Sequence, residues 1–156
     1  MNPTRESVYV ALANLVFTLP EITANFVTTG RFLYHHEQVP GGEDAMPAIF
    51  LVQHPGETHQ RTGRGMEVKR TLRCAFVMYF YTGAPSDLTL LPATACNIGL
   101  DAIDDAINLP ANNNADNVQT LGGLVEHVYT EGAVAIAEGL LQNVSIVALP
   151  ITILLP

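Results

Sequence analysis

Five histidines are the side chains best suited to acid–base or metal chemistry. His35 and His36 are adjacent and are followed by Glu37, while His54 and His59 belong to one polar segment. Zinc sites use three or four such ligands at recognisable spacings, and no such set is present in the sequence. We therefore predict no metal and no cofactor, and we keep a small histidine-containing hydrolase or ligand-binding domain as an alternative.

Two cysteines are the candidate nucleophiles, and neither has a catalytic setting. Cys74 falls on the apolar side of an expected strand, where a thiol is usually inert and would need a base from elsewhere in the chain. Its spacing from Cys96 does not indicate a disulfide, so we expect two reduced, buried thiols. The glycines of 62–65 and 121–123 lack the context of a phosphate loop or dinucleotide site. We predict that the chain is not an enzyme.

The charges are divided along the chain. The formal net charge is −8, and five of the seven basic residues fall between positions 61 and 73, with none after them. So few cations argue against nucleic-acid recognition, which needs a cationic surface. This basic group consists of Arg61, Arg64, Lys69, Arg70 and Arg73.

The later part of the sequence is acidic. The carboxylates of Asp101, Asp104 and Asp105 share about one helical turn, and they would suit a divalent cation less well than a solvated or partner-facing surface. With Glu126 and Glu131 they form a candidate acidic face. A basic patch on one copy and an acidic face on the next favour head-to-tail contacts, which close into a ring when the rotation allows. The alternative is a solvated loop beside a solvated strand.

The composition indicates one domain over residues 1–156. Hydrophobic residues make up 48% of the chain and charged residues 14%, which is low for a soluble protein and suggests buried contacts between subunits. No stretch reaches the roughly 20 apolar residues of a membrane span, and the first residues lack the layout of a signal peptide. We expect a protein that is made in the cytoplasm and has no membrane partner.

Hydrophobic spacing predicts the elements of the first half. A helix with a stripe from Val8 to Leu19 begins at a Thr4 cap and stops at Pro20. An extended segment is possible at 25–34, a buried strand is expected at 47–53, and 57–65 is expected to be a mobile loop. Residues 66–81 alternate as one strand too long for the domain, so their first half should project as a hairpin arm with that loop at its tip.

The second half predicts a helix and two strands. The helix spans about 91–107, with Ala95, Ile98, Ile103 and Ile107 toward the core. Strands follow at about 125–138 and 144–154, with Gly132 a possible bulge. The fold class is α/β in the broad sense (α+β): a mainly antiparallel or mixed sheet with helices packed on it and a long β-hairpin arm.

Several phrases in this order resemble the tail-terminator and tail-completion proteins of long-tailed bacteriophages, which are small α/β subunits. The similar segments are 48–51, 72–81, 96–106, 120–125, 129–132 and 149–154. The resemblance implies a virion protein at the neck end of the tail, which forms a homo-oligomeric ring, typically a hexamer. Such a ring stops growth of the tail tube and contacts both the tail tube protein and the head–tail connector protein. A head-side completion protein or a tail tube subunit is the neighbouring alternative.

Overall fold

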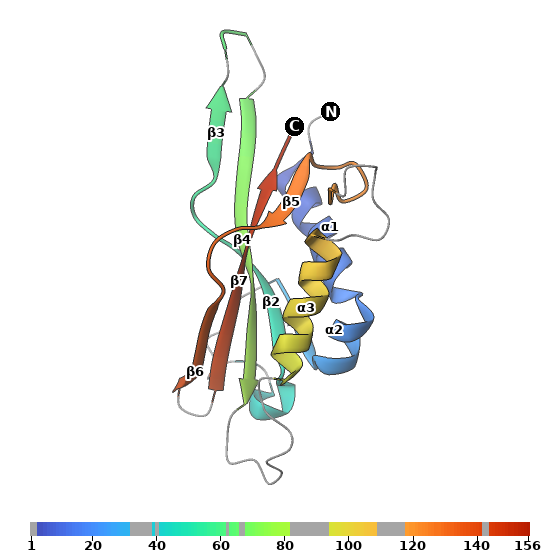
Figure 1. Cartoon of the computed structure of the whole chain (residues 1–156), viewed down its shortest axis with the longest axis vertical. Helices are drawn as coiled ribbons and strands as arrows, with labels where there is room; N and C mark the ends of the chain where they lie inside the picture. Colours follow the sequence, from blue (N-terminus) through green and yellow to red (C-terminus); the bar gives the residue numbers. More distant parts are fainter. Residues whose placement is uncertain are drawn as a thin grey trace.

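The protein, described as a computed structural model, has an α+β fold in which three α-helices cover one face of a seven-stranded mixed sheet (Figure 1). The structure describes residues 3–31, 39, 41–61, 63–65, 68–81, 94–108, 118–141 and 144–156. The helices are α1 (Arg5–Phe17), α2 (Pro20–Asn25), α3 (Thr94–Asn108) and a short 3-10 helix, η1 (Gly42–Ala45). The strands are β1 (Thr28–Gly30), β2 (Ala48–Gln53), β3 (Thr58–Arg61), β4 (Val68–Tyr81), β5 (His127–Thr130), β6 (Ala135–Leu141) and β7 (Val144–Leu154). The predicted fold class is confirmed.

The sheet is built around the antiparallel pair of β4 and β7. The strand order is β1-β2-β4-β7-β5, with β3 pairing along β4 beyond β2 and β6 pairing along β7 beyond β5. Among the described strands only β1 and β2 run parallel. In Figure 1, β3 and β2 appear on opposite sides of β4 because the strands twist along their length.

Strand β4 is apolar on both faces in its second half, as the sequence predicted. Phe76 and Met78 belong to the core beneath the helices, while Val77 and Tyr79 pack on the opposite face. That opposite face is closed by Met46 and other residues around η1. Burial on both sides removes the need for polar alternation, which explains the apolar run.

The first helix begins where the sequence predicted, with the Thr4 hydroxyl accepting the Ser7 backbone N–H at 3.1 Å. Val8, Leu12 and Val16 form part of its buried side. Pro20 lies beyond its end, but it also begins α2, which the sequence did not predict. Proline suits the first turn of a helix because the N–H it lacks would have no partner there.

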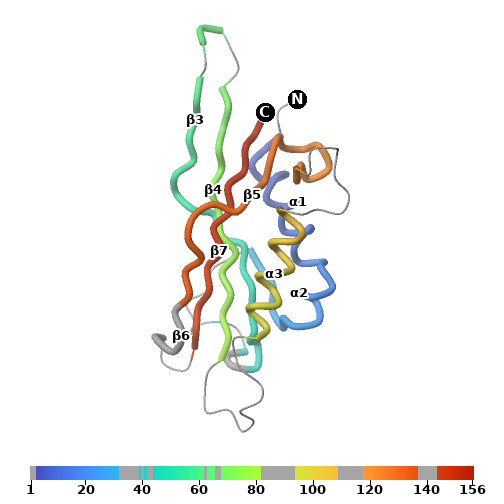
Figure 2. The backbone as a smooth tube through the Cα atoms, viewed as in Figure 1, coloured from blue at the N-terminus to red at the C-terminus, as the bar shows by residue number. Residues whose placement is uncertain are grey.

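Strand pairing is interrupted on both outer sides of the central β4–β7 pair (Figure 2). One break separates β2 from β3, and the other separates β5 from β6. Gln53 pairs with Cys74 and Thr58 pairs with Thr71, so residues 54–57 bow out opposite only 72–73. The expectation of a loop throughout 57–65 is therefore wrong at Thr58–Arg61, which is strand β3. These polar residues form a strand because β4 extends beyond β2 and offers free backbone partners.

The expected strand at 125–138 is likewise wrong as a single element. Thr130 pairs with Ile151 and Ala135 with Ala148, so residues 131–134 bow out opposite 149–150. The carbonyl of Pro150 accepts the Glu131 N–H, so the proline nitrogen, which carries no hydrogen, faces this same edge. Gly132 has φ +100° in the break, a conformation that favours glycine. The predicted irregularity at Gly132 is thus a complete interruption.

The third helix is present, but its buried side differs from the prediction. Ile103 and Ile107 are buried as expected, whereas Ala95 and Ile98 are only half-buried. Cys96 and Gly99 occupy the core side instead. A Cβ atom on Gly99 would lie 2.8 Å from the ring of Phe26, so glycine lets α3 approach α2 closely, and this approach sets the rotation of the helix.

In the expected extended segment at 25–34, only Thr28–Gly30 forms a strand, and 32–34 lie outside the described residues.

We predict that Gly99→Val destabilises the fold by about 1 to 3 kcal/mol, because the added side chain collides with the buried ring of Phe26. The measurement is the free energy of unfolding in urea. Ala95→Val on the same helix is the control, since its side chain is half-exposed, and it should cost about 0.5 kcal/mol. Equal costs for the two variants would show that the close contact at Gly99 is unimportant.

Candidate assembly surface

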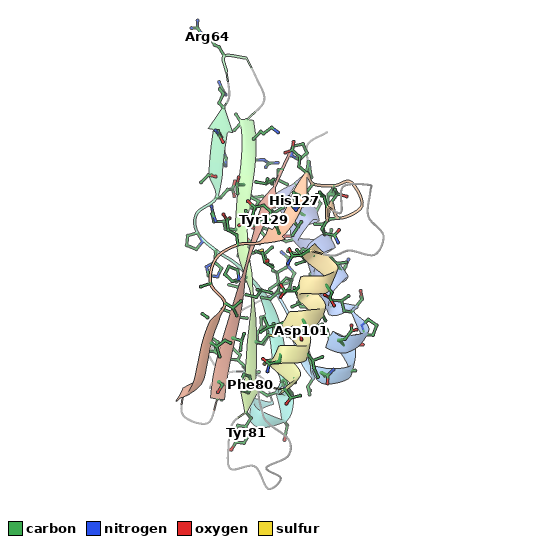
Figure 3. All side chains as sticks on the ribbon, viewed as in Figure 1. Arg64, Phe80, Tyr81, Asp101, His127 and Tyr129 are labelled. Carbon is green, nitrogen blue, oxygen red and sulfur yellow. The ribbon has the colours of Figure 1, made fainter. Side chains whose placement is uncertain are left out.

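The hairpin of β3 and residues 68–71 forms an arm that extends beyond the rest of the sheet (Figure 1). All four residues of β3 are exposed. Strand β7 ends its pairing with β4 at Thr71, so β3 is the only described strand beside the outer part of β4. Arg64 lies at the far tip (Figure 3).

Two of the predicted basic residues bind two of the predicted acidic residues within the same chain. The Lys69 ammonium donates to Glu126 at 2.8 Å, and Arg73 lies 3.4 Å from Glu131. Both pairs join β4 to residues at the two ends of β5, because the long side chains reach across β7, which lies between the two strands. These four residues are already paired in one copy, so they are poorer candidates for contact between copies than the sequence suggested.

Arg70 is also engaged inside the chain. Its side chain turns toward the helical face and donates to the backbone carbonyl of Pro3 at 2.9 Å. Arg61 and Arg64 differ, since neither forms an ion pair with any residue that the structure describes. The predicted basic group therefore reduces to two unpaired arginines at the outer end of the arm.

The base of the arm is fixed to α1 by a contact that the sequence did not reveal. Two guanidinium nitrogens of Arg5 donate to the carboxylate of Glu57, Nε at 2.7 Å and Nη2 to the other oxygen, and the same carboxylate lies 2.7 Å from the His59 ring nitrogen. The hydrogen bond from Arg5 lowers the pKa of Glu57 to about 2, and the hydrogen bond with His59 contributes a smaller part of this shift. No local pattern could predict this pair, because its partners are 52 residues apart in the sequence.

The acidic side of α3 is far from the arm tip (Figure 3). Asp101 and Asp105 are exposed and Asp104 is half-buried, as the helical spacing predicted. Partial burial, and then the charges of Asp101 and Asp105, raise the pKa of Asp104. No cation among the described residues neutralises this group. Within one copy, the unpaired arginines and these aspartates cannot meet.

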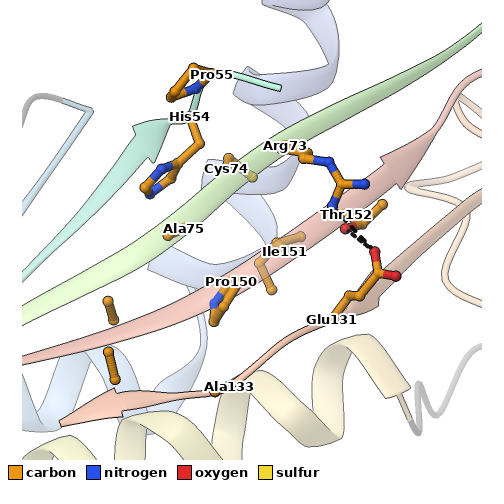
Figure 4. A pocket seen from close by; sticks show the side chains of 12 residues that line it. His54, Pro55, Arg73, Cys74, Ala75, Glu131, Ala133, Pro150, Ile151 and Thr152 are labelled. Carbon is orange, nitrogen blue, oxygen red and sulfur yellow. Dashed lines mark hydrogen bonds and ion pairs between the residues drawn. The ribbon is translucent and has the colours of Figure 1, made fainter. Parts of the chain in front are cut away.

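A shallow groove of about 260 Å³ lies on the sheet face opposite the helices, between the two strand breaks (Figure 4). His54 and Pro55 border one side, and Glu131 and Ala133 border the other. The Thr152 hydroxyl donates to Glu131 at 2.8 Å. Small side chains leave the floor shallow, and the polar groups of Glu131 and Thr152 are already satisfied, so the groove offers little for recognising a small molecule.

The residues considered for chemistry are not brought together. Cys74 and Cys96 are free and buried, as predicted, and burial raises the pKa of each thiol to about 12, which keeps both protonated at neutral pH. His35, His36 and Glu37 lie outside the described residues. Within the described part of the chain, no three His, Cys, Asp or Glu residues are grouped as metal ligands, and no helix there has the length and apolar character to span a membrane.

Comparison with known proteins identifies no relative: no protein-family model and no curated protein matches the chain. Function has to be argued from the surface just described. Its distinctive parts are the projecting arm, the two unpaired arginines and the acidic side of α3.

We predict that the Arg5–Glu57 contact contributes to stability in a pH-dependent way. The pKa of Glu57 is lower in the folded than in the unfolded chain, so its contribution is complete above about pH 4.5 and is lost as the pH falls toward 2. Glu57→Gln should therefore be less stable than the parent at pH 6, with the difference vanishing near pH 2.

The measurement is the midpoint of thermal unfolding between pH 2 and 6. Glu21→Gln is the control, because Glu21 forms no ion pair with a described residue, and it should follow the parent curve. A constant difference between Glu57→Gln and parent at every pH would contradict the assignment.

Proposed function

We propose that this chain is a structural virion protein: a tail terminator whose copies join head to tail into a ring that caps the tail tube of a long-tailed bacteriophage. The observation that carries the proposal is the arm. It extends beyond the domain, is exposed along the whole of β3, and ends in charges that no described residue of the same chain neutralises.

The arm supports contact between copies because neither its outer backbone edge nor its two arginines have a partner among the residues that the structure describes. An exposed strand edge is a ready site for pairing with another chain, and natural proteins usually protect or cover it. The contact would be heterologous, since the arm tip and the acidic side of α3 are different surfaces at different places on the molecule (Figure 3). Heterologous contacts generate either closed rings or open filaments.

The choice of a closed ring that ends a tube rests on the order of elements. The helix, strands, helix and strands of this chain, together with the long arm, are similar to those of tail terminators. In that role the ring would contact the tail tube protein on one side and the head–tail connector protein on the other. A tail tube subunit or a head-side completion protein would share the same fold class and the same need for self-assembly.

The experiment is light scattering over a range of protein and salt concentrations, followed by electron microscopy of the large species. A terminator should give closed rings that stop the growth of tail tubes in vitro. Long cylinders formed by the protein alone would identify a tube subunit instead. A protein that stays monomeric under every condition and does not bind tail tubes would contradict the proposal.

We predict that reversing both free arm charges, with Arg61→Glu and Arg64→Glu, weakens association between copies by about tenfold or more. Ion pairs of Arg61 and Arg64 with Asp101 and Asp105 of another copy would each contribute up to about 1 kcal/mol to association. The reversal removes these pairs and adds repulsion between the new glutamates and the aspartates. Raising the salt concentration should weaken the parent assembly in the same direction. The measurement is the dissociation constant from sedimentation.

A charge swap makes the test specific to these surfaces. Adding Asp101→Arg and Asp105→Arg to the arm variant should restore association, because the signs on both sides are then exchanged. Arg31→Glu is the control for one charge reversal away from the arm, to be compared with Arg61→Glu or Arg64→Glu alone, since Arg31 is paired with Glu6 in its own chain. No recovery in the swapped variant would remove the aspartates from the interface.

A further inference from the structure

The outer edge of β6 is, like that of β3, without a partner strand in the part of the chain that the structure describes. Strand β6 bonds to β7 on one side, and no described strand lies on the other. Ile136 is 55% exposed and Val134, just before the strand, is 41% exposed. Two large apolar side chains thus stand beside a row of backbone donors and acceptors that have no partner strand.

This edge carries few of the devices that protect strand edges. Natural edges are usually short, or carry lysine, proline or an inward-pointing charge. Strand β6 spans seven residues and contains no lysine, arginine or proline, and the register shift between Ala137 and Leu141 leaves Ala135–Ala137 as its regularly paired part. An edge of this composition invites pairing with another strand, so it needs a cover in the assembled protein.

The outer edge of β3 has the complementary properties. Its residues are all exposed, and the segment 58–64 contains Arg61 and Arg64 but no acidic residue. Residues 131–141, which include β6, contain no basic residue and two glutamates, of which Glu131 is paired with Arg73 in its own chain, so the net negative charge comes from Glu138. One edge is cationic and carried on a projecting arm, and the other is anionic and apolar on the body.

These two edges cannot pair within one copy. In the sheet they are separated by β4 and β7, and β3 lies at one end of the molecule while β6 lies at the other (Figures 1 and 2). Three strand spacings of about 4.8 Å already place them about 14 Å apart. Any pairing between them joins two molecules.

We infer that β3 of one copy adds as a strand to the open edge of β6 in the next copy, so that the sheets of neighbouring subunits become continuous. This inference rests on the self-assembly in the proposed function, and it replaces the acidic side of α3 with the β6 edge as the surface that receives the arm, so recovery of association in the charge-swapped variant would count against it. Main-chain hydrogen bonds would supply the affinity, as in other strand additions, and the arginines of the arm would direct the encounter. The occupant of the β6 edge is therefore a second copy of this chain.

The test uses cysteine cross-linking in the full-length protein. Gln60→Cys in β3 and Ile136→Cys in β6 are combined, while the two native cysteines are buried and give little background. A disulfide needs Cα atoms within about 7 Å, so the engineered pair can join only different copies. We expect a ladder of linked oligomers under mild oxidation, and Gln60→Cys combined with Val10→Cys on α1 should give none.

The outcomes separate the two proposals. Oligomers that form normally but show no link beyond that control would overturn the strand addition and leave the ring intact. Failure of the parent protein to assemble or to bind tail tubes would overturn both.

A second variant tests the apolar edge without cysteine chemistry. Ile136→Lys should weaken association at least about tenfold, since it places a charge beside the cationic arm, and it should not alter the fold because the side chain is exposed. Val27→Lys is the matched control, because Val27 is 64% exposed and lies away from both edges. Equal association of Ile136→Lys and Val27→Lys would overturn the inference.

Discussion

The rest of the structure depends on the long antiparallel ladder between β4 and β7. Eleven register pairs, from Thr71–Leu154 to Tyr81–Val144, hold the two strands together. Their backbone groups satisfy one another regardless of side-chain type, so the pair can carry an apolar core on one end and polar residues on the other. The break between β2 and β3 lies near one end of this ladder, opposite 72–73, and the break between β5 and β6 lies near its middle, opposite 149–150, while β4 continues beyond β7. The arm is therefore an extension of the most regular part of the sheet.

The charges divide into two groups with different consequences. Pairs such as Lys69–Glu126 and Arg73–Glu131 tie β4 to the ends of β5, and their exposure to solvent limits their effect on stability. They do fix the direction in which the arm leaves the body. Arg61 and Arg64 have no such partner among the described residues, so their charge is available for steering and for discrimination between contacts. A patch that looked uniform in the sequence thus serves two purposes.

The sequence predicted those elements whose side-chain pattern repeats over a whole segment. Strand β7, the apolar half of β4 and the Thr4-capped helix all follow from local spacing. The break between β5 and β6 could not be located from the sequence of those two strands, because the residue without a backbone N–H is Pro150, which belongs to β7. Strand β3 has no apolar pattern at all, and it forms because β4 offers backbone partners. The pairing of Arg5 with Glu57 and the rotation of α3 at Gly99 both depend on contacts between distant segments.

Strand edges are the parts of this sheet whose backbone groups remain available for contact with another copy. A sheet whose central pair is satisfied leaves its unpaired groups at the outer strands, and among the described strands the edges considered for assembly are those of β3 and β6, since β1 has only three residues. They differ in charge and in apolar character, and they lie at opposite ends of one molecule. A two-fold dimer would use both edges of each copy at once, with each arm on the β6 edge of the other copy. Pairing each edge with the other kind uses one contact per subunit repeatedly, and only the angle between successive copies then decides whether the array closes.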